Sequence, residues 1–115
     1  MDDIPGPTGP QGPACRALSE HTEAAKAILR AISNESRMMI LCCLAGGEMS
    51  VGQIIARTAL RQPVVSQQLA FLREQKMVDS RRDGKEVHYT LTSVPVRTVL
   101  ESLDEVFTQR NPPRG

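Results

Sequence analysis

The residues with the most distinctive chemistry lie near the middle of the 115-residue chain, in the stretch Leu60–Arg73 (LRQPVVSQQLAFLR). Pro63 suits the first turn of a helix, where its missing N–H costs nothing, so we expect Gln62 to cap a helix here. One face of that helix is apolar, with residues at intervals of three and four: Val65, Leu69 and Leu72. The other face carries hydrogen-bonding side chains: Gln62, Ser66, Gln67 and Arg73. We expect the neighbouring Gln68 to contact a base edge or a phosphate. Side chains that both donate and accept hydrogen bonds can recognise base edges in a DNA major groove, although a plain solvated face is the alternative.

A second cluster of functional side chains is basic and follows this helix closely. The segments Met77–Arg82 and Lys85–Leu91 alternate apolar and polar residues as strands do, and Asp83-Gly84 between them predicts a tight hairpin. Three cations lie around its tip: Arg81, Arg82 and Lys85. The whole chain has a net charge of only +1, so phosphate binding would require a local cluster of this kind. We expect these residues to contact a DNA backbone or minor groove.

The chain has three cysteines, Cys15, Cys42 and Cys43. Its N-terminus is acidic and rich in Pro and Gly, where a secretory signal needs basic and apolar residues, so we expect a cytoplasmic protein with reduced thiols. On a helical wheel Cys42 falls at the edge of the apolar face of its helix, and Cys43 lies nearly opposite that face. This predicts that Cys42 packs as a small hydrophobic residue and that Cys43 does so less well.

The rest of the chain supplies the elements that must position these groups. We expect residues 1–17 to form a disordered Pro/Gly-rich arm, residues 18–110 one folded domain, and residues 111–115 a disordered tail. Apolar periodicity and capping residues predict further helices. They are about Ser19 to Ile32, Glu35–Ala45 capped by Asn34, a short helix capped by Ser50 that runs to about Arg57, and a last helix opened by Ser93 or Pro95. Only Thr58–Arg61 separate the third helix from the helix that begins near Gln62, which predicts a helix-turn-helix.

Composition argues against several other classes of protein. Hydrophobic residues make up 40% of the chain and aromatic residues only 3%, which suits an aliphatic core between helices. No apolar run approaches the roughly 20 residues that cross a bilayer, so we expect no membrane partner. The sequence has no Ser–His–acid order and no Gly-rich phosphate loop, so we expect neither an enzyme nor a cofactor. A helical dimer that binds only other proteins remains an alternative to a DNA-binding protein. Salt dependence distinguishes these two functions, because DNA binding weakens steeply as the salt concentration rises.

Three segments together resemble the ArsR/SmtB family of winged helix-turn-helix repressors: NESRMMILCCL from Asn34, LRQPVVSQQLAFLREQKMV from Leu60, and RRDGKEVHYTL from Arg81. The resemblance covers about Ala24 to Phe107 and is strongest to the branch with nodulation regulators of the NolR type and sulfur and redox regulators of the HlyU/BigR type. It implies a mainly α fold with a small β-hairpin, a winged helix-turn-helix, and a homodimer formed by the first and last helices. We therefore expect a transcriptional repressor that binds double-stranded DNA. Because a two-fold dimer matches a palindrome, its operator should be an inverted repeat with half-sites about one helical turn apart.

Some members of this family sense metals, and the chain departs from their sites. One site needs paired cysteines on the third helix, where this chain has Met49 to Gln53. Another needs Asp, His and Glu on the last helix, which contains no His. His21 and His88 stand alone in the sequence without ligand spacing, so we expect no metal site.

The resemblance does not carry over a redox mechanism either. In the sulfur- and redox-sensing relatives a cysteine matching Cys42 pairs with one near the end of the last helix, where this chain has Val106 and Phe107. Cys15 and Cys43 remain as partners, although a bridge between neighbouring residues would be strained. We expect oxidation of Cys42 or Cys43 by peroxide or reactive sulfur to release DNA, with inert packing and a cysteine-based As(III) or soft-metal response as the alternatives.

Overall fold

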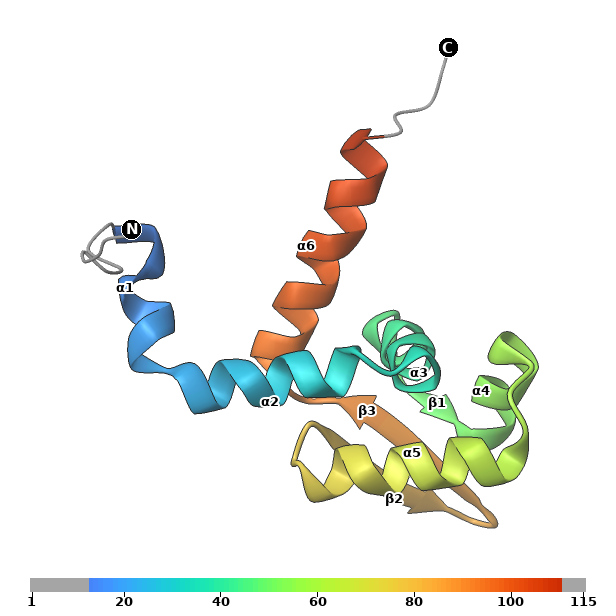
Figure 1. Cartoon of the computed structure of the whole chain (residues 1–115). Coiled ribbons are helices and arrows are strands. Elements are labelled where there is room, and N and C mark those ends of the chain that lie inside the picture. The colour runs from blue at the N-terminus through green and yellow to red at the C-terminus, as the bar shows by residue number, and fades with distance from the viewer. Residues whose placement is uncertain (1–12, 111–115) are drawn as a thin grey trace. The chain divides into compact units, whose positions relative to one another are not determined.

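Figure 1 shows the computed structural model of the chain, which describes residues 13–110. The chain divides into two compact units between Arg30 and Ala31. The predicted folded domain, residues 18–110, includes parts of both units. Residues 1–12 and 111–115, which we expected to be disordered, lie outside the described residues. Within the described part, no helix is long and apolar enough to span a membrane.

The first unit contains α1 (Pro13–Glu20) and most of α2 (Thr22–Ile32). The sequence predicted an arm without regular structure up to residue 17 and a single helix over Ser19–Ile32. The structure differs in both respects, because helix already begins at Pro13 and is interrupted at His21. Around the break, side chains bind nearby carbonyls: Ser19 Oγ donates to Arg16 O (2.9 Å), Thr22 Oγ1 donates to Ser19 O (3.1 Å), and His21 Nδ1 lies 2.9 Å from Ala17 O. Such local bonds compete with the helical ladder.

The second unit holds the polar helix and the elements around it. In chain order they are α3 (Glu35–Ala45), β1 (Met49–Ser50), α4 (Val51–Thr58), α5 (Gln62–Glu74), β2 (Val78–Asp83), β3 (Glu86–Leu91) and α6 (Val94–Arg110). The predicted cap of α3 is confirmed, since Asn34 Oδ1 accepts the backbone N–H of Arg37 at 2.9 Å. The cap of α4 is confirmed as well, and Ser50 and Gln53 form a reciprocal capping box.

The three strands form an antiparallel sheet in the order β1-β3-β2. The predicted hairpin is confirmed, but its tip is shifted by one residue. Asp83 pairs with Glu86, so Gly84 and Lys85 make the turn, and Gly84 supplies the positive φ of 67° that the turn needs. Strand β1 was not predicted, because two residues are too short to show a period.

The core of the second unit lies between α3, α4, α5 and the sheet. Its fully buried side chains include Ile40, Leu41, Leu44, Ile54, Val65, Leu69 and Leu72. The predicted apolar stripe of α5 is therefore confirmed. This burial holds α5 beside β2 of the hairpin, as Figure 1 shows. The polar side chains of its other face stay exposed.

The last helix, α6, is partly buried and partly exposed. Ser93 opens it, since Ser93 Oγ accepts the backbone N–H of Val96 at 3.2 Å. Val96 and Leu100 join the core. Farther along, Leu103, Val106 and Phe107 are exposed although they are apolar, and Phe107 is 63% exposed. Helix α6 thus carries an apolar surface along its C-terminal half.

Candidate nucleic-acid interface

The outer face of α5 presents the short polar side chains that the sequence singled out. Gln62, Ser66 and Gln67 are all exposed, and they occupy the first half of the helix. The helix cannot easily roll this face inward, because Val65 and Leu69 on its other side are fully buried. The arrangement presents neutral hydrogen-bonding groups on a helix fixed to a packed core, which is the chemistry of base recognition in a major groove.

The turn that delivers α5 is tight and internally bonded. Ala59 takes a left-handed conformation with φ of 62°, and the hydroxyl of buried Thr58 both donates to Ile54 O (2.8 Å) and accepts from Leu60 N–H (3.2 Å). The predicted cap at Gln62 is wrong by one residue. Arg61 is the N-cap and makes no side-chain capping bond, so Gln62 lies inside the helix. Arg61 is exposed and basic at the start of α5. The sequence did not single it out as a candidate DNA contact.

Gln68 does not face outward with its neighbours. It is half-buried, and its Oε1 accepts a hydrogen bond of 3.0 Å from Arg37 Nη1 on α3. We had expected Gln68 to contact a base edge or a phosphate. Consecutive residues of an α-helix point about 100° apart around its axis. Gln68 therefore points towards the body of the protein, whereas Gln67 points outward.

Two of the three predicted cations of the hairpin are exposed at its outer end. Lys85 lies in the turn itself, and Arg82 lies on β2 opposite Val87. The hairpin is thus a wing whose tip exposes two cations, Arg82 and Lys85, beside the carboxylates of Asp83 and Glu86. Such cations bind DNA phosphates whatever the base sequence.

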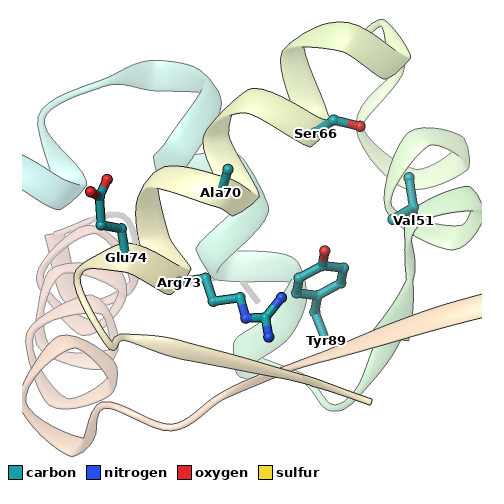
Figure 2. A pocket seen from close by; sticks show the side chains of 6 residues that line it. All are labelled: Val51, Ser66, Ala70, Arg73, Glu74 and Tyr89. Atoms are coloured by element: carbon teal, nitrogen blue, oxygen red, sulfur yellow. The ribbon is translucent and has the colours of Figure 1, made fainter. Parts of the chain in front are cut away.

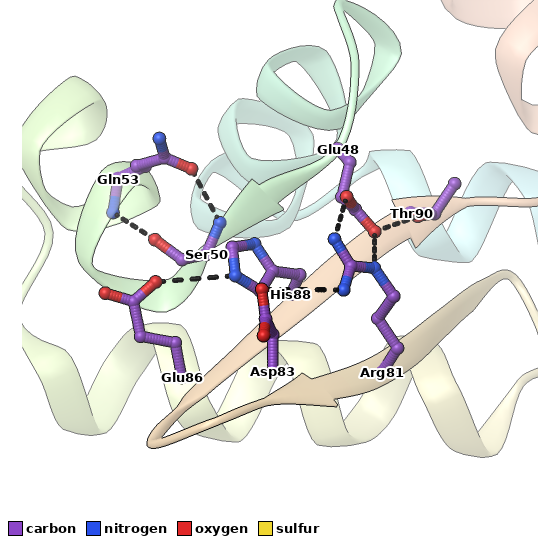
Figure 3. Close-up of polar contacts among 8 residues, drawn as sticks. All are labelled: Glu48, Ser50, Gln53, Arg81, Asp83, Glu86, His88 and Thr90. Carbon is purple, nitrogen blue, oxygen red and sulfur yellow. Dashed lines mark hydrogen bonds and ion pairs between the residues drawn. The ribbon is translucent and has the colours of Figure 1, made fainter.

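Arg81, the third cation, is held in a network at the base of the wing (Figure 3). Its Nε and Nη2 donate to the two carboxylate oxygens of Glu48 at 2.8 Å and 2.9 Å, and Asp83 lies 3.9 Å from its Nη1. Thr90 donates a further bond of 3.4 Å to Glu48. The hydrogen bond from Arg81 lowers the pKa of Glu48 below its usual range and raises that of Arg81. Arg81 therefore ties the wing to the segment before β1, a role the sequence did not predict.

A hollow of about 450 Å³ separates α5 from the sheet and the start of α4. Ser66 and Arg73 line it from α5, and Tyr89 lines it from β3. Figure 2 shows the Arg73 side chain extending towards the ring of Tyr89. Arg73 is exposed, as predicted. Tyr89 was not predicted as part of the site, because only strand pairing brings it opposite α5.

The two neighbouring cysteines of α3 lie the opposite way round from the prediction. Cys43 is buried, and Cys42 is exposed beside a hollow of about 360 Å³ between α3 and α6. The wheel assumed one narrow apolar face, but α3 packs against α4, α5 and β3, so its buried arc extends round to Cys43. Burial raises the pKa of both thiols. Cys43 and Asp104 raise that of Cys42 further, whereas Arg57 partly offsets the shift at Cys43.

Cys15 is exposed on α1, in the first unit. Among residues 13–110, no three His, Cys, Asp or Glu side chains are grouped so that they could hold a metal ion. His88 instead lies 3.4 Å from the Glu86 carboxylate on the wing.

Comparison with known proteins identifies the same elements. Residues 34–80, from the cap of α3 into β2, match the family described as bacterial regulatory protein, arsR family. The transcriptional activator HlyU of Vibrio cholerae is 37% identical over 94 residues, which are 82% of this chain and 87% of that protein. The biofilm growth-associated repressor of Agrobacterium fabrum is 36% identical over 91 residues, 79% of this chain and 78% of that protein.

Solved structures agree with the sequence matches. The transcriptional repressor BigR from Xylella fastidiosa has a TM-score of 0.76 at 32% identity, over 79% of this chain and 93% of that one. The resemblance inferred from the three sequence segments is confirmed, and it removes the alternative of a module that binds only proteins. These relatives are named as an activator or repressors of transcription. The chain belongs to the ArsR family of bacterial transcriptional regulators and has the winged helix-turn-helix fold of that family.

Proposed function

We propose that the chain is a cytoplasmic repressor that binds a specific double-stranded DNA operator as a homodimer. One observation carries the proposal: Gln62, Ser66 and Gln67 are exposed together on α5, whose other face is fixed in the core. In this proposal those three side chains contact base edges in the major groove.

The basic side chains then position the protein on the duplex. Arg73 contacts a phosphate beside the major groove, and Arg82 and Lys85 anchor the wing to the backbone or minor groove. Arg81 contributes indirectly, because Glu48 already occupies its guanidinium. Gln68 is not part of this contact surface, since its oxygen is bonded to Arg37.

The apolar surfaces outside the core support a homodimer through the first and last helices. On α6, Leu103, Val106 and Phe107 are exposed. In the first unit, Leu18 and Leu29 are exposed beside a hollow of about 380 Å³ that Cys15 also lines. Burying such side chains between two copies is favourable at roughly 25 cal/mol per Å². A two-fold dimer presents two α5 helices, which suits an inverted repeat with half-sites about one turn apart.

The test combines DNA binding with sedimentation. We expect the protein to sediment as a dimer at micromolar concentration. We also expect it to bind the DNA upstream of its own gene at least 10³-fold more tightly than a scrambled duplex. A salt series should lower the affinity for both duplexes with similar slopes. A monomer with full affinity would contradict the dimer, and equal affinity for the two duplexes would contradict sequence-specific binding.

We further propose that oxidation of Cys42 releases the DNA. The observation in favour is that Cys42 is exposed and lines a hollow beside α6. Leu100, Glu101 and Asp104 line the same hollow from α6. In the reaction the thiolate attacks one oxygen of hydrogen peroxide, the O–O bond breaks, and the second oxygen leaves as water once protonated, which gives a sulfenic acid. The sulfenic acid would add a polar group to the hollow that Glu101 and Asp104 line on α6, the helix that we assign to the dimer. Because the pKa of Cys42 is raised, the reaction should accelerate with rising pH.

Single substitutions can now separate the cysteines. We expect peroxide to weaken DNA binding by the wild type and by Cys15→Ser, and a thiol reductant to restore it. Cys42→Ser should bind DNA normally and ignore peroxide. If peroxide still releases Cys42→Ser, or fails to release the wild type, Cys42 is not the sensor.

A further inference from the structure

Arg37 makes a set of contacts that neither the motifs nor the proposed DNA contacts account for. It lies in the first turn of α3 and is half-buried. Its Nε donates to the carbonyl of Ala31 at 3.1 Å, and its Nη1 donates to Gln68 Oε1 at 3.0 Å. Its guanidinium carbon also lies 4.3 Å from the centre of the Phe71 ring. One side chain thus joins the end of α2 to the middle of α5.

The chemistry of these contacts is specific to arginine. A guanidinium is planar and holds its donors in a fixed fork, so one group can donate in two set directions while its face stacks on a ring. The Ala31 carbonyl belongs to the last turn of α2, where carbonyls lack helical partners, and Ala31 is fully buried. Arg37 therefore satisfies a carbonyl that would be costly to leave unpaired.

The two contacts on α5 fix how that helix is rotated about its axis. Gln68 and Phe71 are three residues apart and hence neighbours on one side of the helix. The buried side chains of Val65, Leu69 and Leu72 keep the polar face of α5 outward. Because their apolar contacts are non-directional, they still allow small rotations of the helix about its axis. A hydrogen bond and a stacked cation on the same side define its rotation tightly. The rotation of α5 also determines the direction of the Gln67 side chain, because Gln67 is next to Gln68 on the same helix.

We infer that Arg37 is a positioning residue for DNA recognition, which sets the rotation of α5 through Gln68 and Phe71 without itself contacting DNA. The inference rests on the proposed function. Productive recognition geometry tolerates only about 0.5 Å and 10–20°, so loss of this support weakens base contacts. Contacts to the phosphates tolerate such a shift better, since they do not depend on which base is present.

The test compares specific with non-specific binding. The probes are the duplex that the wild-type protein selects from a randomised pool and a scrambled duplex of the same length, at one salt concentration. Arg37→Met should weaken binding to the selected duplex about tenfold or more and change binding to the scrambled duplex by less than about threefold. Arg37→Lys should not restore the ratio, because an ammonium group cannot make the forked and stacked contacts.

Arg97→Met is the matched control. Arg97 is also half-buried and also bonds backbone carbonyls, those of Ala45 (2.8 Å) and Leu91 (3.4 Å), and neither acceptor lies on α5. We expect it to lose stability in urea comparably to Arg37→Met while it keeps the ratio of specific to non-specific binding. An equal ratio in Arg37→Met and the wild type, with stability lost as in Arg97→Met, would show that Arg37 is only structural.

Gln68 provides the reciprocal test and covers the case in which Arg37→Met fails to fold. Gln68→Leu should lose specificity like Arg37→Met, and the effects of the two changes should not multiply in the double variant. Gln68→Glu keeps an acceptor for Arg37 and should keep the ratio. If Gln68→Leu recognises the selected duplex like the wild type, the inference fails. If the wild type selects no preferred duplex at all, the proposed function itself fails and this inference with it.

Discussion

Helix α5 and the wing present functional side chains in two different ways. The exposed polar residues in the first half of α5 are neutral and stand on a helix whose opposite face is fully buried, with Arg37 bonded to its side. The wing is exposed from Arg81 to Glu86, and its base is held by an ion pair between Arg81 and Glu48. Reading base edges requires fixed geometry, whereas attracting phosphates requires mainly charge. The difference implies that α5 governs which sequence is bound and that the wing governs how tightly any sequence is bound.

The largest effect should come from removing the support beneath α5. Leu69→Ala deletes a fully buried side chain and should lower the free energy of unfolding by about 2–5 kcal/mol, measured by urea denaturation. Gln67→Ala, on the exposed face of the same helix, should change it by less than about 0.5 kcal/mol. If the two substitutions cost the same, α5 is not anchored by its apolar stripe.

Next in size is the loss of a base contact. Gln67→Ala should reduce the preference for the operator over mismatched duplexes by about 1–3 kcal/mol, because a bidentate amide contact to one base is lost. Its affinity for a scrambled duplex and its salt slope should stay as in the wild type. Fluorescence anisotropy on a panel of single-base variants measures both. Unchanged preference across the panel would remove Gln67 from the reading face.

A wing cation should give a smaller and uniform effect. Lys85→Ala should weaken binding to operator and scrambled duplexes alike and reduce the slope of log affinity against log salt by about one unit, because one phosphate contact disappears. Lys26→Ala, which removes an exposed cation of the first unit, is the charge control. A change in base preference for Lys85→Ala would mean that the wing also reads sequence.

The smallest effect concerns the ion pair at the base of the wing. Arg81 lowers the pKa of Glu48 in the folded state, so the pair stabilises the fold above the usual glutamate range near pH 4.3 and is lost as pH falls through the lowered value. Glu48→Gln should therefore be less stable than the wild type at pH 7. The difference should shrink as pH falls below the usual glutamate range and vanish only below the lowered pKa of Glu48. High salt should shrink the same difference. A difference independent of pH would exclude this ion pair as its source.

Glu48→Gln also releases the guanidinium of Arg81. At neutral pH we expect this variant to bind all duplexes slightly more tightly and with a steeper salt slope, because a further cation becomes available to phosphates. Unchanged non-specific affinity would show that Arg81 is too far from DNA to contribute.

Local sequence determined most of the helices, the hairpin and the outward face of α5. Caps at Asn34, Ser50 and Ser93, the Pro63 signal and the three-and-four spacing on α5 all act within a few residues, so they can be read from the chain itself. The family resemblance followed from the same segments. Errors in these local features were small, such as the cap at Arg61 instead of Gln62 and the hairpin tip at Gly84-Lys85.

Tertiary packing decided which of the candidate side chains are available. Glu48 neutralises Arg81 across 33 positions in the chain, and Arg37 turns Gln68 inward across 31. Cys43 is buried because α3 is surrounded by α4, α5 and the sheet, so no single apolar face could be read from its wheel. Each of these outcomes depends on partners distant in sequence. The type of a residue and its spacing in the sequence determine which contacts its side chain can make. The atoms packed against that side chain determine whether it is available to make them.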